Sequence, residues 1–469
     1  MTRSESVSTP PWWVLAPAGV ALGVLCLPLA AMPGRWVAAA VAGAFLLVAT
    51  LAAGRPRRAA LVLFVFSLQL GLALYLTEPP SRGSYGASWP DALALPLASL
   101  TALAALATAG LRRTVWSRSF AAGVGLLVLT TVAAIPGSPV RLIGLAHVVM
   151  LGAYLLILLA AANSVRDAGD LELVIGVLMA TLVLQSLVYF VQSLAGATFT
   201  PSGEWIEQSD SGPGRYGGTV GTRPAAFSSF LLPLVLVALA RLLTSTEPGV
   251  WWRYGAPAVL GSAALILTYT RASWGALLLG LAYLAAAAAR RRLLVRARAW
   301  MLLAALTVLL AALSPWILRR ASDDHRAALD ERRALIEMAL RVIRAHPWTG
   351  VGPGAYPFAF RDYLTPELAD RWLFVVHNVY VLRAAETGLP GLAALLLFLW
   401  ASFRIAGPDR MVNPAARSLA LGWRAGLLAL ASEMLWDVSL GPAATGLLWF
   451  LCGLMPAAAR IGLRLKESS

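Results

Sequence analysis

Charged side chains are scarce in this sequence. Only 13% of its 469 residues are charged, whereas 59% are hydrophobic. A water-soluble domain usually carries about 25% charged and about 45–50% apolar residues, so the composition argues against a water-soluble multidomain enzyme. It predicts an integral membrane protein instead.

Cysteine and lysine are nearly missing as well. The two cysteines, Cys26 and Cys452, lie in apolar runs and lack the spacing of metal ligands. Neither a disulfide framework nor a metal site is therefore predicted. The only lysine is Lys466, so arginine supplies almost all of the basic charge behind the net value of +15. Such a charge also occurs in proteins that bind nucleic acid. Arginines between long apolar runs more often set membrane topology, and we expect no nucleic-acid partner.

Long apolar stretches recur along the whole chain. A helix needs about 17–25 such residues to cross the hydrocarbon core of a membrane. Fourteen stretches are candidates, a few of them short enough to be re-entrant or merged, so we expect an all-α polytopic membrane protein with 12–14 transmembrane helices. The stretches are Trp13–Ala31, Trp36–Ala53, Ala59–Leu76, Asp91–Gly110, Phe120–Ile135, Val140–Asn163, Leu171–Ala195, Ala225–Leu243, Tyr254–Thr270, Ala272–Ala289, Ala299–Trp316, Gly391–Phe403, Ser418–Leu435 and Ala443–Ala459.

Arginine clusters between these stretches predict their orientation. Short cytoplasmic loops keep an excess of arginine and lysine. When the spans alternate, the clusters that begin at Arg55, Arg112, Arg290, Arg404 and Arg460 all fall on one side. That side is predicted to be cytoplasmic and to hold both termini. The first span is predicted to remain as a transmembrane helix rather than to be cleaved off as a signal peptide, because many more spans follow it.

Two hydrophilic connections fall on the opposite, outer side and contain most of the acidic residues. One covers residues 196–222 and the other roughly residues 318–390. We therefore divide the chain into an N-terminal helix bundle (residues 1–315), a large outer loop with amphipathic helices (residues 316–390) and C-terminal helices (residues 391–469). No pair of matching halves, as in many transporters, is apparent. Function is expected on the outer side.

The long loop begins with a basic amphipathic helix, predicted over Ser322–Ala345 and ended by Pro347. Such a helix can lie along the membrane interface with its arginines on phosphate headgroups, or pack over the bundle with a charged face in water. The sequence leaves both alternatives open. Alternate glycines follow from Gly350 to Gly354, and they allow a tight turn or close approach to a ligand. No strand precedes them and no Gly-Lys-Ser follows, so a nucleotide P-loop is excluded.

Three polar residues from distant parts of the chain fall at one depth on the outer side. Arg223 lies at the entrance of one span, Arg271 in a tight turn between two others, and His377 where the long loop re-enters the membrane. Charged groups there are costly and point to function, although a lone boundary arginine is often only a snorkelling anchor. Arginine binds diphosphate oxygens without a metal, and histidine can accept a proton from an attacking hydroxyl. We therefore predict Arg223, Arg271 and His377 as the catalytic residues.

Other polar residues near the outer boundary are weaker candidates. Arg141 and Arg215 are expected on the same face as auxiliary ligands. Glu433 and Asp437 lie near the outer turn of the last hairpin. The sequence allows them to pair either with a catalytic arginine or with Arg424.

Four segments together resemble the O-antigen ligase and polymerase superfamily. They are the turn Thr270–Ser273, the segment His346–Gly352 after the arginine-rich helix, the pair His377-Asn378 and the segment Glu386–Gly391. The matching region runs from about Arg223 to Gly391. Many members have serine where this chain has Thr270, a departure that leaves Arg271 in its position.

The resemblance implies a GT-C-like glycosyltransferase in the bacterial inner membrane whose active site faces the periplasm. For an O-antigen ligase, the donor is a glycan linked to undecaprenyl diphosphate and the acceptor is a sugar hydroxyl of the lipid A–core oligosaccharide. Neither ATP, a metal nor another cofactor is implied. Polymerases of the superfamily use another lipid-linked repeat unit as acceptor, and related enzymes glycosylate proteins. A flippase for lipid-linked oligosaccharides is a non-enzymatic alternative.

The same resemblance implies roles for single residues. Arg223 and Arg271 would hold the diphosphate, and His377 would orient or deprotonate the acceptor hydroxyl. Glu386 would orient His377 or another basic residue, and the arginines of the loop helix would guide a phosphorylated acceptor. The expected substrate-binding residues are Arg215, Arg141, Tyr269, Asn378, Glu386, Gly352, Gly354, Tyr356, Arg341 and Arg344.

Overall fold

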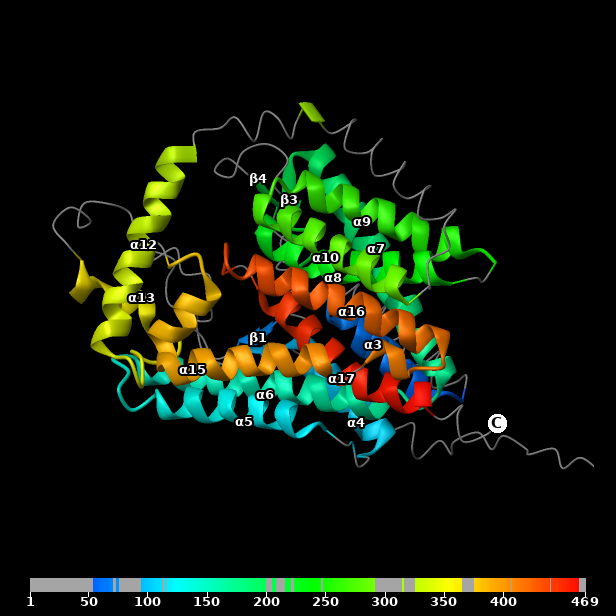
Figure 1. The fold of residues 1–469 in the computed structure, drawn as a ribbon, viewed down its shortest axis with the longest axis horizontal. Helices are drawn as coiled ribbons and strands as arrows, with labels where there is room; N and C mark the ends of the chain where they lie inside the picture. Colours follow the sequence, from blue (N-terminus) through cyan, green and yellow to red (C-terminus); the bar gives the residue numbers. More distant parts are fainter. Residues whose placement is uncertain are drawn as a thin grey trace, which may run out of the picture.

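The protein is built from long helices with a few very short strands (Figure 1). The computed structural model describes residues 54–70, 73–75, 94–111, 114, 116–199, 205–207, 216–220, 223–245, 248–291, 314–315, 325–364, 375–405, 407–438 and 440–463. The predicted spans Trp13–Ala31 and Trp36–Ala53, and most of Ala299–Trp316, lie outside the described residues. The expected all-α, polytopic architecture is confirmed.

The first half of the described chain contains α3 (Pro56–Ser67), β1 (Ala73–Tyr75), β2 (Ala94–Pro96), α4 (Leu97–Ala109), α5 (Arg118–Ala133), α6 (Arg141–Ser164), α7 (Ala168–Ala195), β3 (Ala197–Phe199), β4 (Trp205–Glu207) and α8 (Pro224–Thr244). The second half contains the π-helix η2 (Trp251–Gly255), α9 (Ala256–Leu267), α10 (Arg271–Arg290), α12 (His325–Ala345), α13 (Tyr356–Ala359), the 3-10 helix η3 (Phe360–Tyr363), α15 (Val379–Arg404), the 3-10 helix η4 (Pro408–Arg410), α16 (Pro414–Glu433) and α17 (Pro442–Leu463).

Six of the described helices, α6, α7, α8, α10, α15 and α17, are long and apolar enough to cross a membrane. The bounds of five of them lie close to the predicted ones, but α15 begins at Val379, twelve residues before the predicted span Gly391–Phe403. Two predicted spans, Ala59–Leu76 and Asp91–Gly110, need correction. Helix α3 stops at Ser67, and β1 pairs antiparallel with β2 before α4 begins. Because Ala94–Pro96 pair with β1 as a strand, α4 begins only at Leu97.

Helix α8 forms the centre of the bundle, and all its residues from Pro224 to Leu243 are buried. It packs antiparallel to α16, where two glycines permit close approach. A Cβ added at Gly426 would lie 2.9 Å from the Cα of Pro233, and one at Gly422 would lie 2.6 Å from the Cα of Val237. Small residues at such crossings let helix backbones approach, the usual basis of helix association in membranes.

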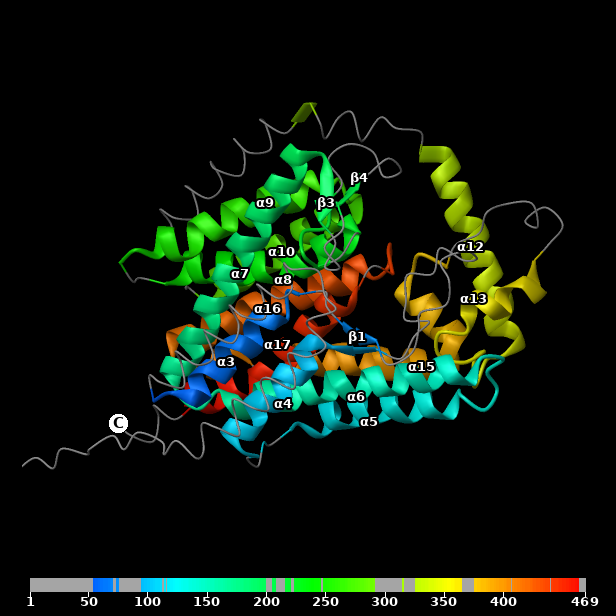
Figure 2. The same cartoon turned by 180° about the vertical axis from the view of Figure 1, so that it is seen from behind.

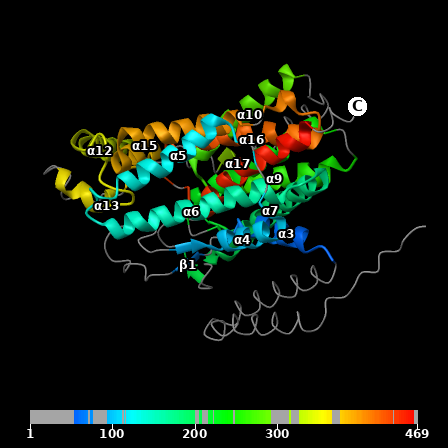
Figure 3. The same ribbon diagram turned by 90° about the horizontal axis from the view of Figure 1, so that it is seen from below.

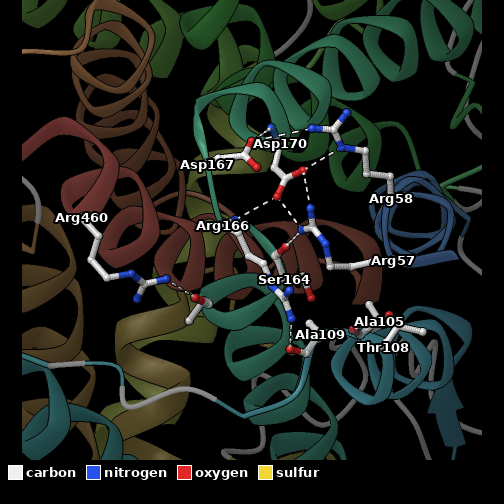
Figure 4. Close-up of polar contacts among 11 residues, drawn as sticks. Arg57, Arg58, Ala105, Thr108, Ala109, Ser164, Arg166, Asp167, Asp170 and Arg460 are labelled. Atoms are coloured by element: carbon white, nitrogen blue, oxygen red, sulfur yellow. Dashed lines mark hydrogen bonds and ion pairs between the residues drawn. The ribbon is translucent and has the colours of Figure 1, made fainter. Parts of the chain in front are cut away.

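The bundle has two ends with different polar groups. Helices α8, α10 and α15 begin at the end where α12 and α13 lie, which we call the loop end (Figures 1 and 2). At the opposite end, which we call the arginine end, Arg57 donates to Asp170 at 2.5 and 3.0 Å and Arg58 donates to it at 3.1 Å (Figure 4). Arg460 donates to the carbonyl of Ala162 at 2.7 Å, near the end of α6. Arginines therefore satisfy the last carbonyls of helices there.

A second charged group joins α8 to its neighbours near the arginine end. The side chain of Arg241 is only 1% exposed and donates to Glu172 of α7 at 2.9 and 3.0 Å. It also donates to Tyr254 at 2.7 Å and to Ser418 of α16 at 3.2 Å. A buried guanidinium needs such partners, since an unpaired charge in this position would be very costly.

Buried glutamines of α7 hold the segment Tyr216–Val220 that leads towards Arg223. Gln192 accepts from the N–H of Gly218 at 2.9 Å and donates to its carbonyl at 3.0 Å. Gln185 accepts from the N–H of Thr219 at 3.1 Å and donates to its hydroxyl at 2.6 Å. The connection after α7 thus returns into the helix bundle before α8 starts.

The loop helix α12 buries its apolar face within the protein. Leu335, Met338, Ala339 and Val342 are fully buried in a small second core. Their partners come from the segment after α12 and from α15, namely Val351, Ala355, Tyr356, Ala359, Phe360, Val376 and Ala385. Of the two alternatives for this helix, the structure shows the packed one, although its partners are the loop itself and α15. Figure 3 shows α12 and α13 together at one end of the long axis.

The alternate glycines after α12 attach the loop to α15. Val351 and Gly352 donate their N–H groups to the carbonyls of Ala385 and Glu386 at 3.0 and 2.9 Å. Helix α15 is kinked at Gly388, whose φ of 71° and ψ of 178° fall in a region that is almost restricted to glycine. A Cβ on Gly388 would also overlap the carbonyl of Trp348.

Replacing Gly388 with alanine is expected to lower the free energy of unfolding by about 1–3 kcal/mol, because the backbone conformation becomes strained. The overlap with Trp348 adds to this loss. Thermal unfolding of the purified protein measures the effect. Gly125→Ala is the matched control, since Gly125 lies in α5 with no heavy atom within 4 Å of an added Cβ. Equal unfolding midpoints for the two variants would contradict the prediction.

Candidate functional site

The predicted catalytic residues all lie at the loop end of the bundle. Arg223 immediately precedes α8, Arg271 is the first residue of α10, and His377 lies two residues before α15. The structure adds a carboxylate to them. The Nδ1 atom of His377 lies 3.8 Å from Oδ1 of Asp437, and Arg223 interacts electrostatically with the same Asp437. One carboxylate after α16 therefore lies near two of the three predicted residues.

Backbone and side-chain hydrogen bonds hold His377 against the end of α16. Asn378 caps the N-terminus of α15 by accepting from the N–H of Val381 at 3.0 Å. Its amide nitrogen donates to the carbonyl of Leu435 at 3.0 Å, and the N–H of Val379 donates to the carbonyl of Met434 at 2.9 Å. Asn378 was expected to bind substrate. In the structure, its side chain is used to orient the backbone around His377.

His377 has the surroundings of a proton acceptor. Its side chain is 36% exposed, and that of Asp437 is 20% exposed, so both groups remain within reach of solvent or a ligand. At 3.8 Å, Asp437 does not accept a hydrogen bond from His377.

Arg223 and Arg271 are both placed at helix N-termini. Partial removal from water lowers the pKa of Arg223, and the charge of Asp437 raises it. Arg271 follows the turn at Tyr269, whose φ of 55° is unusual for a residue other than glycine. The positive end of each helix dipole adds to the charge of its arginine, a combination that favours anions.

The sequence left open whether Asp437 pairs with a catalytic arginine or with Arg424. Pairing with Arg424 was one alternative, but the guanidinium of Arg424 lies over the ring of Phe403 at 5.0 Å and interacts with Asp409. Asp437 instead faces His377 and Arg223. Its place in the turn after α16, at the predicted outer depth, was the sequence signal for it.

Of the two expected partners of Glu386, His377 or another basic residue, the structure shows another basic residue, Arg383. The Glu386 carboxylate bonds to the backbone of Gly354 and of Tyr356, and it interacts with the charge of Arg383. It therefore helps to attach the loop to α15 and does not orient His377. Arg383 in turn donates to the hydroxyl of Thr131 at 2.6 Å, so this first part of α15 is also joined to α5.

Three more residues expected to bind substrate are covered by protein. A Cβ added at Gly352 would collide with the side chain of Ser138, and one at Gly354 with His147. Tyr356 is fully buried in the second core, where burial, and then the charge of Glu386, raises the pKa of its hydroxyl. Their predicted contact with substrate is replaced by packing, because the glycines permit close contact of the loop with α6 and with the connection that precedes it.

The remaining predicted ligands are dispersed. Arg341 is paired with Glu337 one helical turn earlier, at 2.8 Å, and Arg344 is exposed near the end of α12. Arg141 is exposed at the start of α6, and Arg215 lies outside the described residues. Within the described ranges, no group of three or more His, Cys, Asp or Glu residues could hold a metal ion.

Part of the candidate site lies in a region that is similar to a known protein family. Residues 256–396 match a family model described as O-antigen ligase. The match runs from α9 into α15 and includes Arg271 and His377, whereas Arg223 and Asp437 lie outside it. A search of curated proteins found no match. Residues 256–396 are therefore similar to the O-antigen ligase family, and the long apolar helices of the described chain indicate a multi-pass membrane protein.

Proposed function

We propose that the protein is an O-antigen ligase, an inverting glycosyltransferase that moves a glycan from undecaprenyl diphosphate onto a sugar hydroxyl of a lipid A–core oligosaccharide. The observation that carries the proposal is the position of Asp437 close to both His377 and Arg223, at the end of the bundle where Arg271 begins α10. An anion-binding pair of arginines and a proton acceptor are the groups that this transfer requires.

The two arginines act on the donor. Arg223 and Arg271 bind the diphosphate oxygens and offset the negative charge that develops as the sugar departs from them. Fixed positive groups in a water-poor site commonly supply about 3–4 kcal/mol of transition-state stabilisation each. Because guanidinium groups supply the charge, the proposal requires no metal and no cofactor.

His377 acts on the acceptor. The acceptor oxygen attacks the anomeric carbon from the face opposite the diphosphate, so the new C–O bond forms as the bond to the diphosphate breaks. The hydroxyl proton passes to His377, and Asp437 stabilises the resulting imidazolium. Undecaprenyl diphosphate leaves with the electron pair, and the configuration at the anomeric carbon is inverted.

The proposal includes an orientation in the membrane. The arginine end, with Arg57, Arg58 and Arg460, is cytoplasmic, and the loop end with residues 316–390 faces the periplasm of a bacterial inner membrane. Both termini are then cytoplasmic. The arginines Arg341 and Arg344 on α12 would meet a phosphorylated acceptor outside the membrane.

Purified protein in lipid vesicles, supplied with a fluorescent glycan on undecaprenyl diphosphate and with lipid A–core acceptor, tests the proposal. A ligase attaches the label to lipid A–core, and EDTA leaves the rate unchanged. Label on a second lipid-linked unit would show a polymerase instead, and transfer to protein a protein glycosyltransferase. Movement of donor between leaflets without a new glycosidic bond would show a flippase. Loss of activity with EDTA, restored by Mg²⁺, would contradict the arginine-based mechanism.

A further inference from the structure

A fully buried cluster of three serines and one glutamate lies at the loop end of the bundle. We call it the serine–glutamate cluster, and its members Ser228, Ser229, Ser273 and Glu433 are at most 3% exposed. Ser273 donates its hydroxyl hydrogen to the Glu433 carboxylate, and the Ser273 and Ser228 hydroxyls lie 2.7 Å apart. Ser229 also bonds to the carboxylate. The family match and the proposed mechanism assign no role to this cluster.

The cluster joins three helices whose ends carry the candidate site. Ser228 and Ser229 lie in α8, just after Arg223, and Ser273 lies in the first turn of α10, two residues after Arg271. Glu433 is the last residue of α16. Its backbone carbonyl accepts from the N–H groups of Trp436 and Asp437 at 2.9 and 3.1 Å. A single residue is therefore bonded to both arginine-bearing helix starts and to the turn that holds Asp437.

The physical need for such a connection is clear. The N-termini of α8 and α10 are positive ends of helix dipoles, and each carries an arginine, so they repel each other when no anion lies between them. A buried carboxylate bonded to both helices opposes this repulsion. Its hydrogen bonds are also directional, and therefore they specify how far apart the two helix starts lie.

We propose that Glu433, through Ser273 and Ser228, sets the separation of Arg223 and Arg271 and is a positioning residue for diphosphate recognition. The inference rests on the proposed function, because it assumes that the two arginines share one diphosphate. A diphosphate has two phosphoryl groups at a fixed distance, so its binding depends on the spacing of the two guanidinium groups. A monophosphate can be held by one arginine and depends on that spacing far less.

Binding of undecaprenyl diphosphate and undecaprenyl monophosphate to the full-length protein in nanodiscs tests this role. Glu433→Ala and Ser273→Ala are expected to raise the Kd for the diphosphate about tenfold, and the Kd for the monophosphate less than about threefold. Glu433→Gln is expected to stay within about threefold of the parent for both lipids, because the amide oxygen still accepts from a serine. If the charge of Glu433 alone mattered, Glu433→Gln would bind the diphosphate more tightly than the parent.

Matched controls come from the other end of the same helices. Glu172→Gln removes the charge that pairs with Arg241, and Ser418→Ala removes one of its hydrogen-bond acceptors; Arg241 joins α8 to α7 and α16 near the arginine end. They perturb stability through α8 and α16 without touching the loop end. Both are expected to leave the ratio of the two Kd values unchanged, whatever they do to the unfolding temperature.

Several results would overturn the inference. They are a parent-like diphosphate Kd for Ser273→Ala and Glu433→Ala, an equal loss for monophosphate and diphosphate, or the same change in the Glu172→Gln control. If Glu433→Ala does not fold, Ser273→Ala and Glu433→Gln decide the question. Because binding is measured without transfer, failure of the proposed function is seen separately, as a parent protein that binds undecaprenyl diphosphate but forms no glycosidic bond.

Discussion

Replacing His377 with alanine is expected to lower kcat for glycan transfer about 10²–10⁴-fold, the usual contribution of a positioned general base. The residual rate comes from the arginines, which still bind the donor. The KM for the donor should change little, since His377 acts on the acceptor hydroxyl in the proposed mechanism. Steady-state transfer in lipid vesicles, with the amount of folded protein measured by gel filtration, gives both constants.

His346→Ala is the matched control for this variant. His346 is an exposed histidine at the end of α12, and its Nε2 lies 2.8 Å from the hydroxyl of Tyr363. It belongs to the same loop but pairs with Tyr363, so its loss should leave kcat at the parent value. A parent-like kcat for His377→Ala, or an equal loss for His346→Ala, would remove His377 from the mechanism.

Replacing Arg271 with alanine is expected to lower kcat/KM for the donor about 10²–10³-fold, because a fixed positive group at the leaving diphosphate is lost. Arg271→Lys should recover only part of the rate. Lysine keeps the charge, but it cannot form the two parallel hydrogen bonds of a guanidinium with one phosphoryl group.

Arg290 provides the control from the opposite end of the same helix. It is the exposed last residue of α10, at the arginine end, so Arg290→Ala removes a charge from α10 without altering its first turn. Transfer kinetics should match the parent. If Arg271→Ala and Arg290→Ala lowered kcat/KM equally, the effect would belong to the helix as a whole, and the diphosphate role of Arg271 would be abandoned.

Helix positions were well predicted because they depend on local properties of the chain. The predicted span Phe120–Ile135 is close to α5 at Arg118–Ala133, and Val140–Asn163 is close to α6 at Arg141–Ser164. An apolar run long enough to cross a membrane has few alternatives to a helix, since its backbone groups must be satisfied internally. One exception, at Ala73–Tyr75, lies in a stretch where residues distant in sequence pair as strands. Another is α15, which begins at Val379 and not at the predicted Gly391.

The position of Arg223, Arg271 and His377 at one end of the bundle was also predictable, because alternating spans return connections to the same end. The sequence did not predict which of these helix ends lie beside one another. Several helix ends share that end of the bundle, and only the packing of α16 against α8 at Gly422 and Gly426 brings the turn with Asp437 beside the start of α8.

Glu386 and the glycines also show that the sequence does not determine tertiary contacts. Their sequence pattern indicated a ligand site, but tertiary packing uses Glu386 to hold the backbone of Gly354 and Tyr356, and covers Gly352 with Ser138. The sequence by itself determined a polytopic helical membrane protein with arginines and a histidine at one end of the bundle. The tertiary structure alone decided which of these groups meet, because helix neighbours depend on close packing between segments far apart in the chain, and no local pattern encodes that choice.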